Sequence, residues 1–406
     1  MKWVEIMKYF VMLGDGMADL PVKELGGITP LQKAFKPNID KLATMGTVGL
    51  VKTVPDHIPP GSDVANMSVL GFDPDVFYTG RSPLEAVSMG IKMSDTDMAI
   101  RCNLVTLSDG GKYEDKVMLD YSSDEISTEE SSELIKYLDD HIGTNEMKFY
   151  SGISYRHCLI WDNGPSSLEC TPPHDILEKK VTGYLPAAPH SQILSDLMKK
   201  SYDLLVNHPI NILRRQKGLN AANSIWLWGE GRKPALGNFY DTYKLKGAVV
   251  SAVDLIKGLG ICAGMKSIDV EGATGNIHTN YEGKAKAAID FLSNGGDFVF
   301  LHVEAPDECG HRHEIENKVK AIELIDSKIM APILEYLNRQ GDFKVMVLPD
   351  HPTPLCLRTH THDAVPFIIY DSKNLKCNDL KYCEDDAKTT GLYIEKGHTL
   401  MAQFLA

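Results

Sequence analysis

The sequence predicts an α/β protein whose central sheet is mostly parallel. Short apolar segments rich in β-branched residues recur along the 406 residues, and helical periodicity follows several of them. The clearest unit has a strand over 297–303, a helix with apolar residues spaced by three or four over 319–333, and a strand over 343–348. This order predicts parallel strands joined by a right-handed crossover.

Further strands are predicted over 9–13, 224–228, 248–253 and 365–370. Most of them run directly into polar residues. In open parallel sheets ligands bind beyond the carboxyl ends of the strands, so we expect an active site at one edge of the sheet. The long helix contains Pro332, which lacks a backbone N–H and is expected to bend that helix.

A smaller α+β domain is predicted over 98–185, inserted into a core domain formed by 1–97 and 186–406. Its expected elements are strands over 100–107, 116–121, 147–150 and 157–161 and a helix over 127–142. The proline- and alanine-rich segment 185–189 has linker composition. Met7 resembles a second start, which predicts that residues 1–6 are a dispensable extension.

Composition excludes several classes of protein. With 43% hydrophobic and 24% charged residues the chain is globular, and it is long enough to bury a large core. Because 42 basic side chains face 55 acidic ones, the formal net charge is −13, so we expect neither nucleic acid nor membrane as a partner. The eight cysteines form no C-x-x-C pair and indicate a reduced, cytoplasmic protein without a zinc ribbon. The oligomeric state stays open.

Metal-ligand residue types follow three predicted strands and precede a fourth. They are Asp15, Asp307 with His311, Asp350 with His351, and His360. Carboxylate oxygens and imidazole nitrogens together suit cations such as zinc or manganese, and the number of groups is enough for two ions. Each residue has a structural alternative as a helix cap or a turn residue, but all of them fall at one sheet edge.

Ser62, within Gly61-Ser62-Asp63, is the candidate nucleophile. The glycine permits a tight turn, and a helix that starts here would present its N-terminal amides to an anion. The alternative is that Ser62 only caps this helix. A serine hydroxyl needs a base or a metal to become a good nucleophile.

Seven motifs in order along the chain resemble the archaeal-type cofactor-independent phosphoglycerate mutases of the alkaline phosphatase superfamily. They are Gly14-Asp15-Gly16, Gly61-Ser62-Asp63, Tyr78-Thr79-Gly80-Arg81, Arg101-Cys102-Asn103, Trp226-Leu227-Trp228-Gly229, Glu304-Ala305-Pro306-Asp307 with His311, and Pro349-Asp350-His351. The resemblance spans nearly the whole chain. It implies an alkaline-phosphatase-like three-layer core with an inserted cap, two divalent metal ions and a phosphoserine intermediate.

Carried over by residue, the resemblance implies one metal held by Asp15, Ser62, Asp350 and His351. It implies a second metal held by Asp307, His311 and a third histidine. The family pattern His-Thr-x-x-Pro-Val-Pro aligns on His360, although Ala364 replaces its first proline and His362 adds another imidazole. The expected ions are manganese, zinc, cobalt or magnesium, with no need for 2,3-bisphosphoglycerate.

Recognition of a small anionic phosphorylated substrate requires cations despite the acidic composition. Arginine suits bidentate pairing with carboxylate or phosphate, and lysine supplies a point charge. The resemblance favours Arg101, Arg214 and Lys284 for this task, with Asn103 and His157 as further polar contacts. For each of the cationic residues a solvated surface role is the alternative, and Asn103 and His157 could instead assist phosphoryl transfer as acid or base.

The function expected first is interconversion of 3-phosphoglycerate and 2-phosphoglycerate in glycolysis and gluconeogenesis. Around the nucleophile, however, Val64-Ala65-Asn66-Met67 stands where such mutases usually show Thr-Ala-His-Leu. This variant resembles a branch proposed to act as homoserine kinase in threonine biosynthesis. A Walker-type phosphate loop is missing, which favours the mutase. A non-catalytic metal-binding protein is a third alternative, disfavoured because Ser62 and the expected ligands are present.

Overall fold

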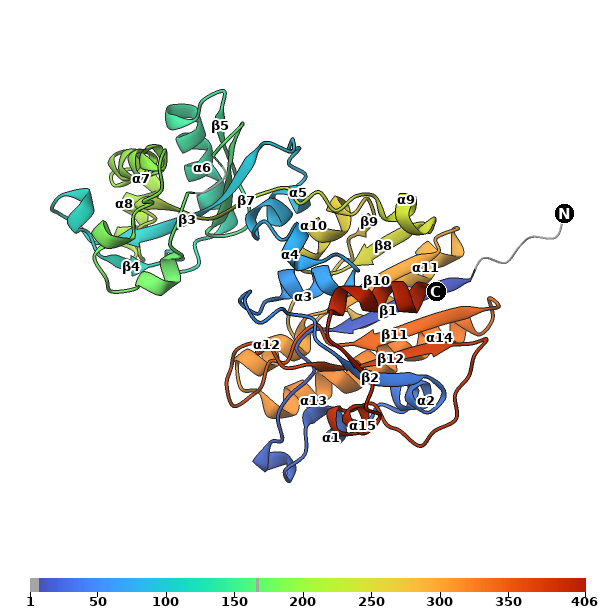
Figure 1. Cartoon of the computed structure of the whole chain (residues 1–406). Helices are drawn as coiled ribbons and strands as arrows, with labels where there is room; N and C mark the ends of the chain where they lie inside the picture. Colours follow the sequence, from blue (N-terminus) through green and yellow to red (C-terminus); the bar gives the residue numbers. More distant parts are fainter. Residues whose placement is uncertain (1–6, 166–167) are drawn as a thin grey trace. The chain divides into compact units, whose positions relative to one another are not determined.

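The computed structural model describes residues 7–165 and 168–406, so the expected extension at residues 1–6 lies outside the described part. The chain divides into two compact units (Figure 1). One comprises the residues up to Tyr78 together with Leu236–Ala406, and the other is Thr79–Ala235. We call them the core unit and the inserted unit.

An eight-stranded sheet forms the centre of the core unit, in the order β13-β2-β12-β11-β1-β10-β8-β9. The central strand β1 pairs in parallel with both β10 and β11, which are the two strands of the predicted crossover. β12 runs antiparallel to β11 and to β2. The strands are β1 (Lys8–Gly14), β2 (Thr47–Val51), β8 (Gly247–Val250), β9 (Lys266–Ile268), β10 (Phe298–Val303), β11 (Phe343–Leu348), β12 (Val365–Asp371) and β13 (Tyr393–Ile394).

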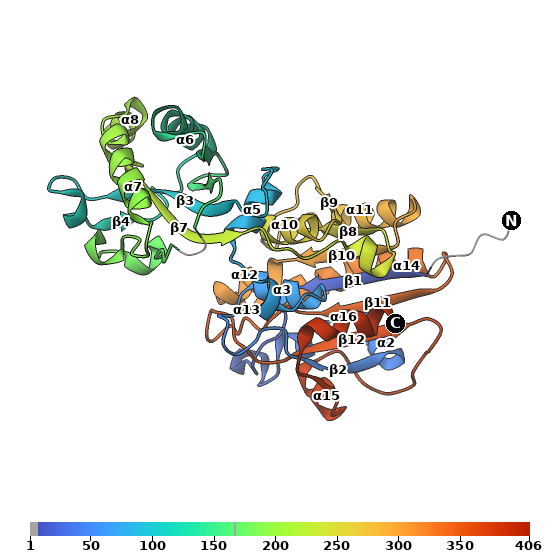
Figure 2. The same ribbon diagram turned by 45° about the horizontal axis from the view of Figure 1, so that its top comes forward.

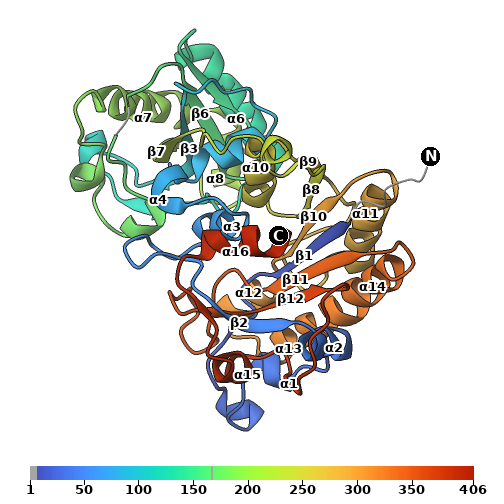
Figure 3. The same cartoon turned by 45° about the vertical axis from the view of Figure 1, so that its right-hand side comes forward.

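Helices cover both faces of this sheet, which confirms the predicted three-layer α/β class (Figures 2 and 3). Val250 of β8 belongs to a core cluster with Ala285 and Ala288 of the helix over 281–293. The neighbouring residue Val249 instead lies against the helix over 254–262, because a Cβ added at Gly260 would lie 2.5 Å from the Val249 side chain. Since adjacent strand residues point to opposite faces, the helices that carry these residues lie on opposite sides of β8. One side has α2 (Pro37–Met45), α11 (Tyr281–Ser293), α13 (Ile315–Leu324) and α14 (Ala331–Leu337), and the other has α3 (Ser62–Val69), α10 (Asp254–Cys262) and α16 (Leu400–Leu405).

The predicted long helix after β10 is interrupted by a π-helical turn, η5 (Ile325–Met330), between α13 and α14. Pro332 lies directly after this turn, at the start of α14, where its missing N–H is tolerated. The remaining helical elements of the core unit are η1 (Lys23–Leu25), α1 (Pro30–Lys33), α4 (Pro74–Phe77), α9 (Phe239–Tyr243), α12 (Ala305–His311), α15 (Glu384–Thr389) and η6 (Gly397–Thr399).

A second, antiparallel sheet organises the inserted unit, in the order β4-β3-β6-β5 with β7 also paired to β3. Its strands are β3 (Met98–Leu107), β4 (Met118–Asp120), β5 (Met147–Tyr150), β6 (Arg156–Trp161) and β7 (Ser224–Arg232). Its helices are α5 (Ser82–Ser88), η2 (Tyr113–Asp115), α6 (Thr128–Ile142), η3 (Pro173–Ile176), η4 (Val181–Tyr184), α7 (Gln192–Leu205) and α8 (Pro209–Gln216).

The inserted unit is wider than the 98–185 range expected from the sequence. On its C-terminal side, β7 pairs with β3 and α7 packs on β7, so residues 186–235 belong to it. On its N-terminal side, α5 packs against both β3 and β7. The segment 185–189 is therefore a connection within the unit, because its composition marks a loop and not a boundary. Within the described ranges, no helix is long and apolar enough to cross a lipid bilayer.

Candidate active site

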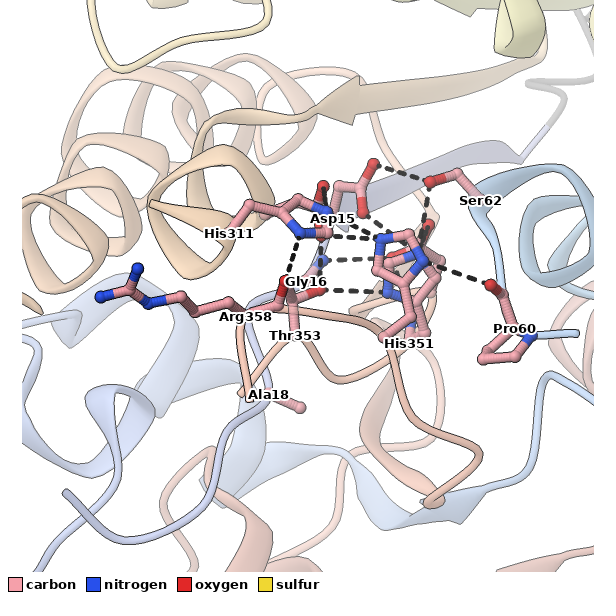
Figure 4. Close-up of polar contacts among 12 residues, drawn as sticks. Asp15, Gly16, Ala18, Pro60, Ser62, His311, His351, Thr353 and Arg358 are labelled. Atoms are coloured by element: carbon pink, nitrogen blue, oxygen red, sulfur yellow. Dashed lines mark hydrogen bonds and ion pairs between the residues drawn. The ribbon is translucent and has the colours of Figure 1, made fainter. Parts of the chain in front are cut away.

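The expected ligand residues gather at the carboxyl ends of three neighbouring parallel strands. Asp15 follows β1, Asp307 lies in α12 after β10, and Asp350 follows β11. The Asp15 N–H donates to the carbonyl of Val303, which ties the loop after β1 to the end of β10 (2.9 Å). Adjacent strand ends explain why residues more than 300 positions apart meet here (Figure 4).

Ser62 is the first residue of α3, and its hydroxyl points into this group (Figure 4). Its Oγ lies 3.4 Å from Asp15 Oδ2 and 3.2 Å from His351 Nε2. The Ser62 side chain caps no backbone N–H of α3, so the structural alternative of a capping serine does not account for its position. The hydroxyl is therefore directed at the ligand groups while it stands at the positive end of a helix.

One part of the site, the histidine cluster, consists of Asp307, His311 and His360. The two imidazole Nε2 atoms lie 3.0 Å apart, and each lies within 3.4 Å of an Asp307 oxygen. His362, the alternative third histidine, instead contacts the carbonyl of Ile58 through its Nε2 (2.9 Å). The structure thus brings His360 and not His362 to this cluster.

The two histidines have the same tautomer because each Nδ1 contacts a backbone carbonyl. His311 Nδ1 donates to Arg358 (3.0 Å) and His360 Nδ1 donates to Pro60 (3.2 Å). A carbonyl only accepts, so in the neutral rings both Nε2 atoms are lone-pair acceptors. Asp307 raises the pKa of His311 to about 9, because the hydrogen bond to its carboxylate stabilises the protonated imidazolium.

The other part, the carboxylate cluster, consists of Asp15, Asp350 and His351, whose side chains are at most 1% exposed. His351 Nε2 lies 3.6 Å from Asp15 Oδ1 and 3.5 Å from Asp350 Oδ2. Burial, together with the negative charges of Asp350 and Asp307, raises the pKa of Asp15 well above its ordinary value. The Oδ1 atom of Asp15 has no hydrogen-bond partner among the described residues.

His302 was not predicted from the sequence and contacts Asp15 directly. It lies in β10, is fully buried, and its Nε2 is 3.0 Å from Asp15 Oδ2. Its Nδ1 contacts Ser251 Oγ (3.2 Å), and burial lowers the pKa of His302 to about 3. Asp15, His302 and Asp350 form a group whose potential ligand atoms all lie within 4.8 Å of one another. The signal in the sequence is a single polar residue near the end of an otherwise apolar strand.

Asn66 is a second residue whose contact with the site was not predicted. It lies one turn after Ser62 in α3 and is fully buried. Its Nδ2 donates to Asp350 Oδ2 and to the Ser62 carbonyl, both at 2.8 Å. The amide thereby links the helix that carries Ser62 to a carboxylate of the site.

The donor set fits divalent cations. Three carboxylates and three imidazoles converge here, and one of their buried oxygens, Asp15 Oδ1, has no hydrogen-bond partner among the described residues. A second potential ligand group joins His351 to Asp307 and His360, so His351 lies within reach of both clusters. Oxygen and nitrogen donors of this kind suit zinc, manganese or cobalt, and ring nitrogens that donate to backbone carbonyls are typical of metal-bound histidines.

Four of the expected substrate-binding residues, Arg101, Asn103, His157 and Arg214, lie in the inserted unit. Arg101 and Asn103 share one face of β3, where the Arg101 guanidinium lies 4.4 Å from the Trp228 ring and the Trp228 N–H donates to Asn103 Oδ1 (3.0 Å). His157 pairs with Cys102 and so belongs to the opposite face. Its Nδ1 accepts from the Gly152 N–H, and its Nε2 has no partner among the described residues.

Arg214 and Lys284 are engaged by other parts of the protein. Arg214 is 3% exposed, and its guanidinium donates to Glu130 and to the carbonyls of Asn220 and Ser123. Lys284 is fully buried and donates to the carbonyl of His302 (3.0 Å). Neither residue is a solvated surface side chain, which was the alternative expected from the sequence, because both are buried and bound to protein groups. The sequence could not distinguish the two roles, because a buried arginine and a substrate-binding arginine look alike in it.

Comparison with known proteins finds relatives that match nearly the whole chain. The family model described as 2,3-bisphosphoglycerate-independent phosphoglycerate mutase matches residues 43–211. A protein of that name from Methanosarcina barkeri is 50% identical over 97% of this chain and 98% of its own length. A probable mutase of the same kind from Geobacter sulfurreducens is 48% identical over 98% of this chain and 100% of its own.

Solved structures agree with the sequence comparison. A Pyrococcus horikoshii protein superposes with a TM-score of 0.82 at 29% identity, covering 99% of this chain and 97% of its own. The cofactor-independent phosphoglycerate mutase from Thermoplasma acidophilum has a TM-score of 0.70 at 25% identity, covering 98% of this chain and 99% of its own. With the sequence identities and the shared fold taken together, the chain belongs to the family of 2,3-bisphosphoglycerate-independent phosphoglycerate mutases.

Proposed function

We propose that the chain interconverts 3-phosphoglycerate and 2-phosphoglycerate by metal-dependent phosphoryl transfer through a phosphoserine at Ser62. Family membership supports the overall reaction. The observation that carries the mechanism is the position of the Ser62 hydroxyl, 3.2 Å from His351 Nε2 and 3.4 Å from Asp15 Oδ2, at the N-terminus of α3.

Asp15, Ser62, Asp350 and His351 would hold one divalent cation, and Asp307, His311 and His360 the other. When bound, such ions supply positive charge that stabilises the serine alkoxide and the phosphoryl oxygens during in-line transfer. Manganese, zinc, cobalt and magnesium are the candidates. The orphaned Asp15 Oδ1 and the facing Nε2 atoms of His311 and His360 support this ligand set.

The chain's own residues perform the transfer in two reciprocal steps. As Ser62 Oγ loses its proton and forms a bond to phosphorus, the bond between phosphorus and the first hydroxyl oxygen of the substrate breaks. That oxygen takes up the proton given up by Ser62, and the glycerate reorients. Its other hydroxyl then attacks phosphorus, and the proton that it gives up returns to the released Ser62 oxygen. The N–H groups at the start of α3 favour the phosphoryl charge, and the buried position of Ser62, 8% exposed, limits access of water.

We also propose that the inserted unit acts as the substrate-binding cap, with Arg101 and Asn103, which share one face of β3, as its contacts. Two contacts of Arg101 support this: its guanidinium lies 4.4 Å from the Trp228 ring and pairs with Glu85 at 3.1 Å. The Arg101 side chain is held in place in this way while 13% of it stays exposed.

His157 is less suited, because it is buried on the opposite face of the sheet. Arg214 and Lys284 are less suited, because protein groups already accept their hydrogen bonds. The relatives described above are named as mutases, so homoserine kinase activity is not favoured.

The test is a side-by-side assay of purified protein by ³¹P NMR. With 3-phosphoglycerate and Mn²⁺, without added bisphosphoglycerate, we expect 2-phosphoglycerate to form. With homoserine and ATP we expect no transfer. Chelation should stop turnover, and added Mn²⁺, Zn²⁺ or Co²⁺ should restore it. Turnover by metal-free protein would contradict the metal-dependent mechanism, and homoserine phosphorylation would replace the proposed reaction.

Ser62→Ala should abolish transfer while most of the bound metal is retained, because only one ligand of several is lost. Ser68→Ala is the matched control, since Ser68 lies in the same helix and is also buried, at 2% exposure against 8% for Ser62. This control should keep wild-type turnover. Full activity of Ser62→Ala would rule out the phosphoserine.

A further inference from the structure

Thr353 connects the two clusters of the site. It lies in the loop between β11 and β12, and its side chain is fully buried. Its Oγ1 donates to Asp307 Oδ1 of the histidine cluster and lies 3.3 Å from His351 Nδ1 of the carboxylate cluster. Figure 4 shows Thr353 beside His351 and Gly16. One hydroxyl therefore contacts a potential ligand from each cluster.

The direction of these hydrogen bonds follows from counting donors. An ionised carboxylate only accepts, so the single hydroxyl proton of Thr353 is directed to Asp307. The hydroxyl oxygen then faces His351 Nδ1 with a lone pair, and a bond at this position requires a proton on Nδ1. His351 Nε2 is left as the acceptor, and this atom lies 3.2 Å from Ser62 Oγ.

The backbone around Thr353 leaves this hydroxyl little freedom. The Thr353 carbonyl accepts from Lys318 Nζ at 2.8 Å, and its N–H donates to the Ala18 carbonyl at 3.3 Å. A Cβ at Gly16 would lie 2.6 Å from Thr353 Oγ1, and one at Gly310 would lie 2.5 Å from the Thr353 carbonyl oxygen. Two glycines thus let neighbouring backbone approach Thr353 closely, and a buried lysine holds its peptide group.

We propose that Thr353 is a positioning residue, which fixes the Nδ1–H tautomer of His351, orients Asp307 and thereby couples the two clusters. The inference rests on the proposed metal-dependent function and deepens it. Thr353 would determine which nitrogen of His351 carries the proton, and so would leave Nε2, the nitrogen that faces Ser62, as an acceptor. Removing a group that orients a metal ligand in this way commonly lowers the metal affinity by about 10- to 100-fold.

Thr353→Val tests the proposal, because valine keeps the branched shape and removes only the hydroxyl. The variant leaves one Asp307 oxygen without its donor and allows His351 either tautomer. We expect the affinity of metal-free protein for Mn²⁺, measured by titration calorimetry, to fall about 10- to 100-fold. Thr353→Ser, which restores the hydroxyl, should bind within about threefold of wild type. At saturating Mn²⁺, the valine variant should lose kcat with little change in KM.

Thr106→Val is the matched control for loss of a buried hydroxyl. Thr106 is 6% exposed and donates to the Ala221 carbonyl in the inserted unit (2.9 Å). This variant should lose stability without any change in Mn²⁺ affinity. An equal loss of affinity in Thr106→Val and Thr353→Val would assign the effect to general destabilisation and overturn the proposal.

A spectroscopic measurement on the wild-type protein tests the tautomer without any variant of Thr353. Long-range ¹H–¹⁵N correlation spectra of metal-free protein, with His351 assigned by comparison with His351→Gln, should show the proton on Nδ1. A proton on Nε2 alone would overturn the proposal even if Thr353→Val failed to fold. If wild-type protein bound no metal, the proposed function would fail, while the spectrum would still decide the role of Thr353.

Discussion

Two buried aspartates, four residues apart in the loop after β1, are treated in opposite ways by the rest of the protein. Asp19 receives an ion pair from Lys318 (2.7 Å) and hydrogen bonds from the N–H groups of Leu20 and Leu355. Asp15 Oδ2 contacts His302 and Ser62, whereas its Oδ1 lies 3.6 Å from His351 Nε2 and has no hydrogen-bond partner within the described residues. The protein thus supplies a cation to Asp19 and none to Asp15.

This difference separates a carboxylate that stabilises the fold from one that is prepared for a ligand. A buried charge without compensation is costly, and a chain that can place a fully buried lysine beside Asp19 could have done the same for Asp15. The missing charge beside Asp15 is therefore a feature of the site. It is the feature expected if, as proposed, a divalent cation binds beside Asp15.

Replacing each aspartate by asparagine should separate the two roles, and Asp15→Asn should have the largest effect. Asparagine keeps the shape but removes the charge that attracts a cation, so we expect kcat to fall by about 10³-fold or more. The metal-free variant should be at least as stable as metal-free wild type in urea, because a buried negative charge has been removed. A marked loss of metal-free stability would show that the fold depends on the Asp15 charge.

Asp19→Asn should behave in the opposite manner. The variant leaves Lys318 as a buried charge without its counter-ion, and we expect a loss of about 3–5 kcal/mol of unfolding free energy, with or without metal. The double variant Asp19→Asn/Lys318→Met should recover part of this loss, because both charges are removed together. A double variant as unstable as the sum of the single variants would contradict the pairing.

His360 and His362 offer the same contrast two residues apart. His360 Nε2 faces Asp307 and His311, whereas His362 Nε2 faces the Ile58 carbonyl. We expect His360→Asn to weaken Mn²⁺ binding by more than the roughly 10- to 100-fold that is typical when a group that only orients a ligand is lost, and His362→Asn to leave binding unchanged. Titration calorimetry of the two variants decides the matter. Equal losses would mean that the histidine cluster extends to His362.

His157 extends the comparison to a buried group that stays neutral. Burial lowers its pKa to about 3 from an ordinary value of 6.5, so the unfolded chain binds the proton more tightly than the folded protein does. The unfolding free energy should therefore fall as the pH drops below 6.5, by about 1.4 kcal/mol per pH unit and about 2 kcal/mol at pH 5.

His157→Asn should remove this contribution and flatten the pH dependence of urea unfolding between pH 6.5 and pH 5. His141→Asn is the control, because His141 is exposed on α6. Parallel curves for wild type and His157→Asn would indicate that His157 titrates in the folded protein near its ordinary pKa.

The sequence predicted most strands of the core unit because the apolar runs in the sequence coincide there with the buried strands of the sheet. The strand expected over 9–13 is β1 (Lys8–Gly14), and that over 365–370 is β12 (Val365–Asp371). The extent of the inserted unit was not predicted, since β7 joins it only by pairing with a strand about 120 residues earlier. Such long-range pairing leaves no local signal in the residues of β7.

In the site, the positions of Asp15, Asp307 and Asp350 could be predicted because each follows a buried strand. His302 and Thr353 could not, because their importance lies in which neighbour they contact and not in their spacing. The difference between His360 and His362 also depends on the path of a loop that has no periodic pattern. Sequence thus indicates groups at strand ends, and structure is needed for the groups that hold them.

The π-helical turn η5 has a consequence for engineering this protein. Its Asp326 side chain accepts from the Ile39 N–H and from Asn38 Nδ2, both at 2.8 Å, at the start of α2. The helix α2 has no side-chain cap at its own Lys36. Deleting one residue from η5 would restore an ordinary α-helix and rotate the preceding turns by about 100° relative to α14. A shortened protein would then lose the anchor of a helix almost 290 positions earlier in the chain.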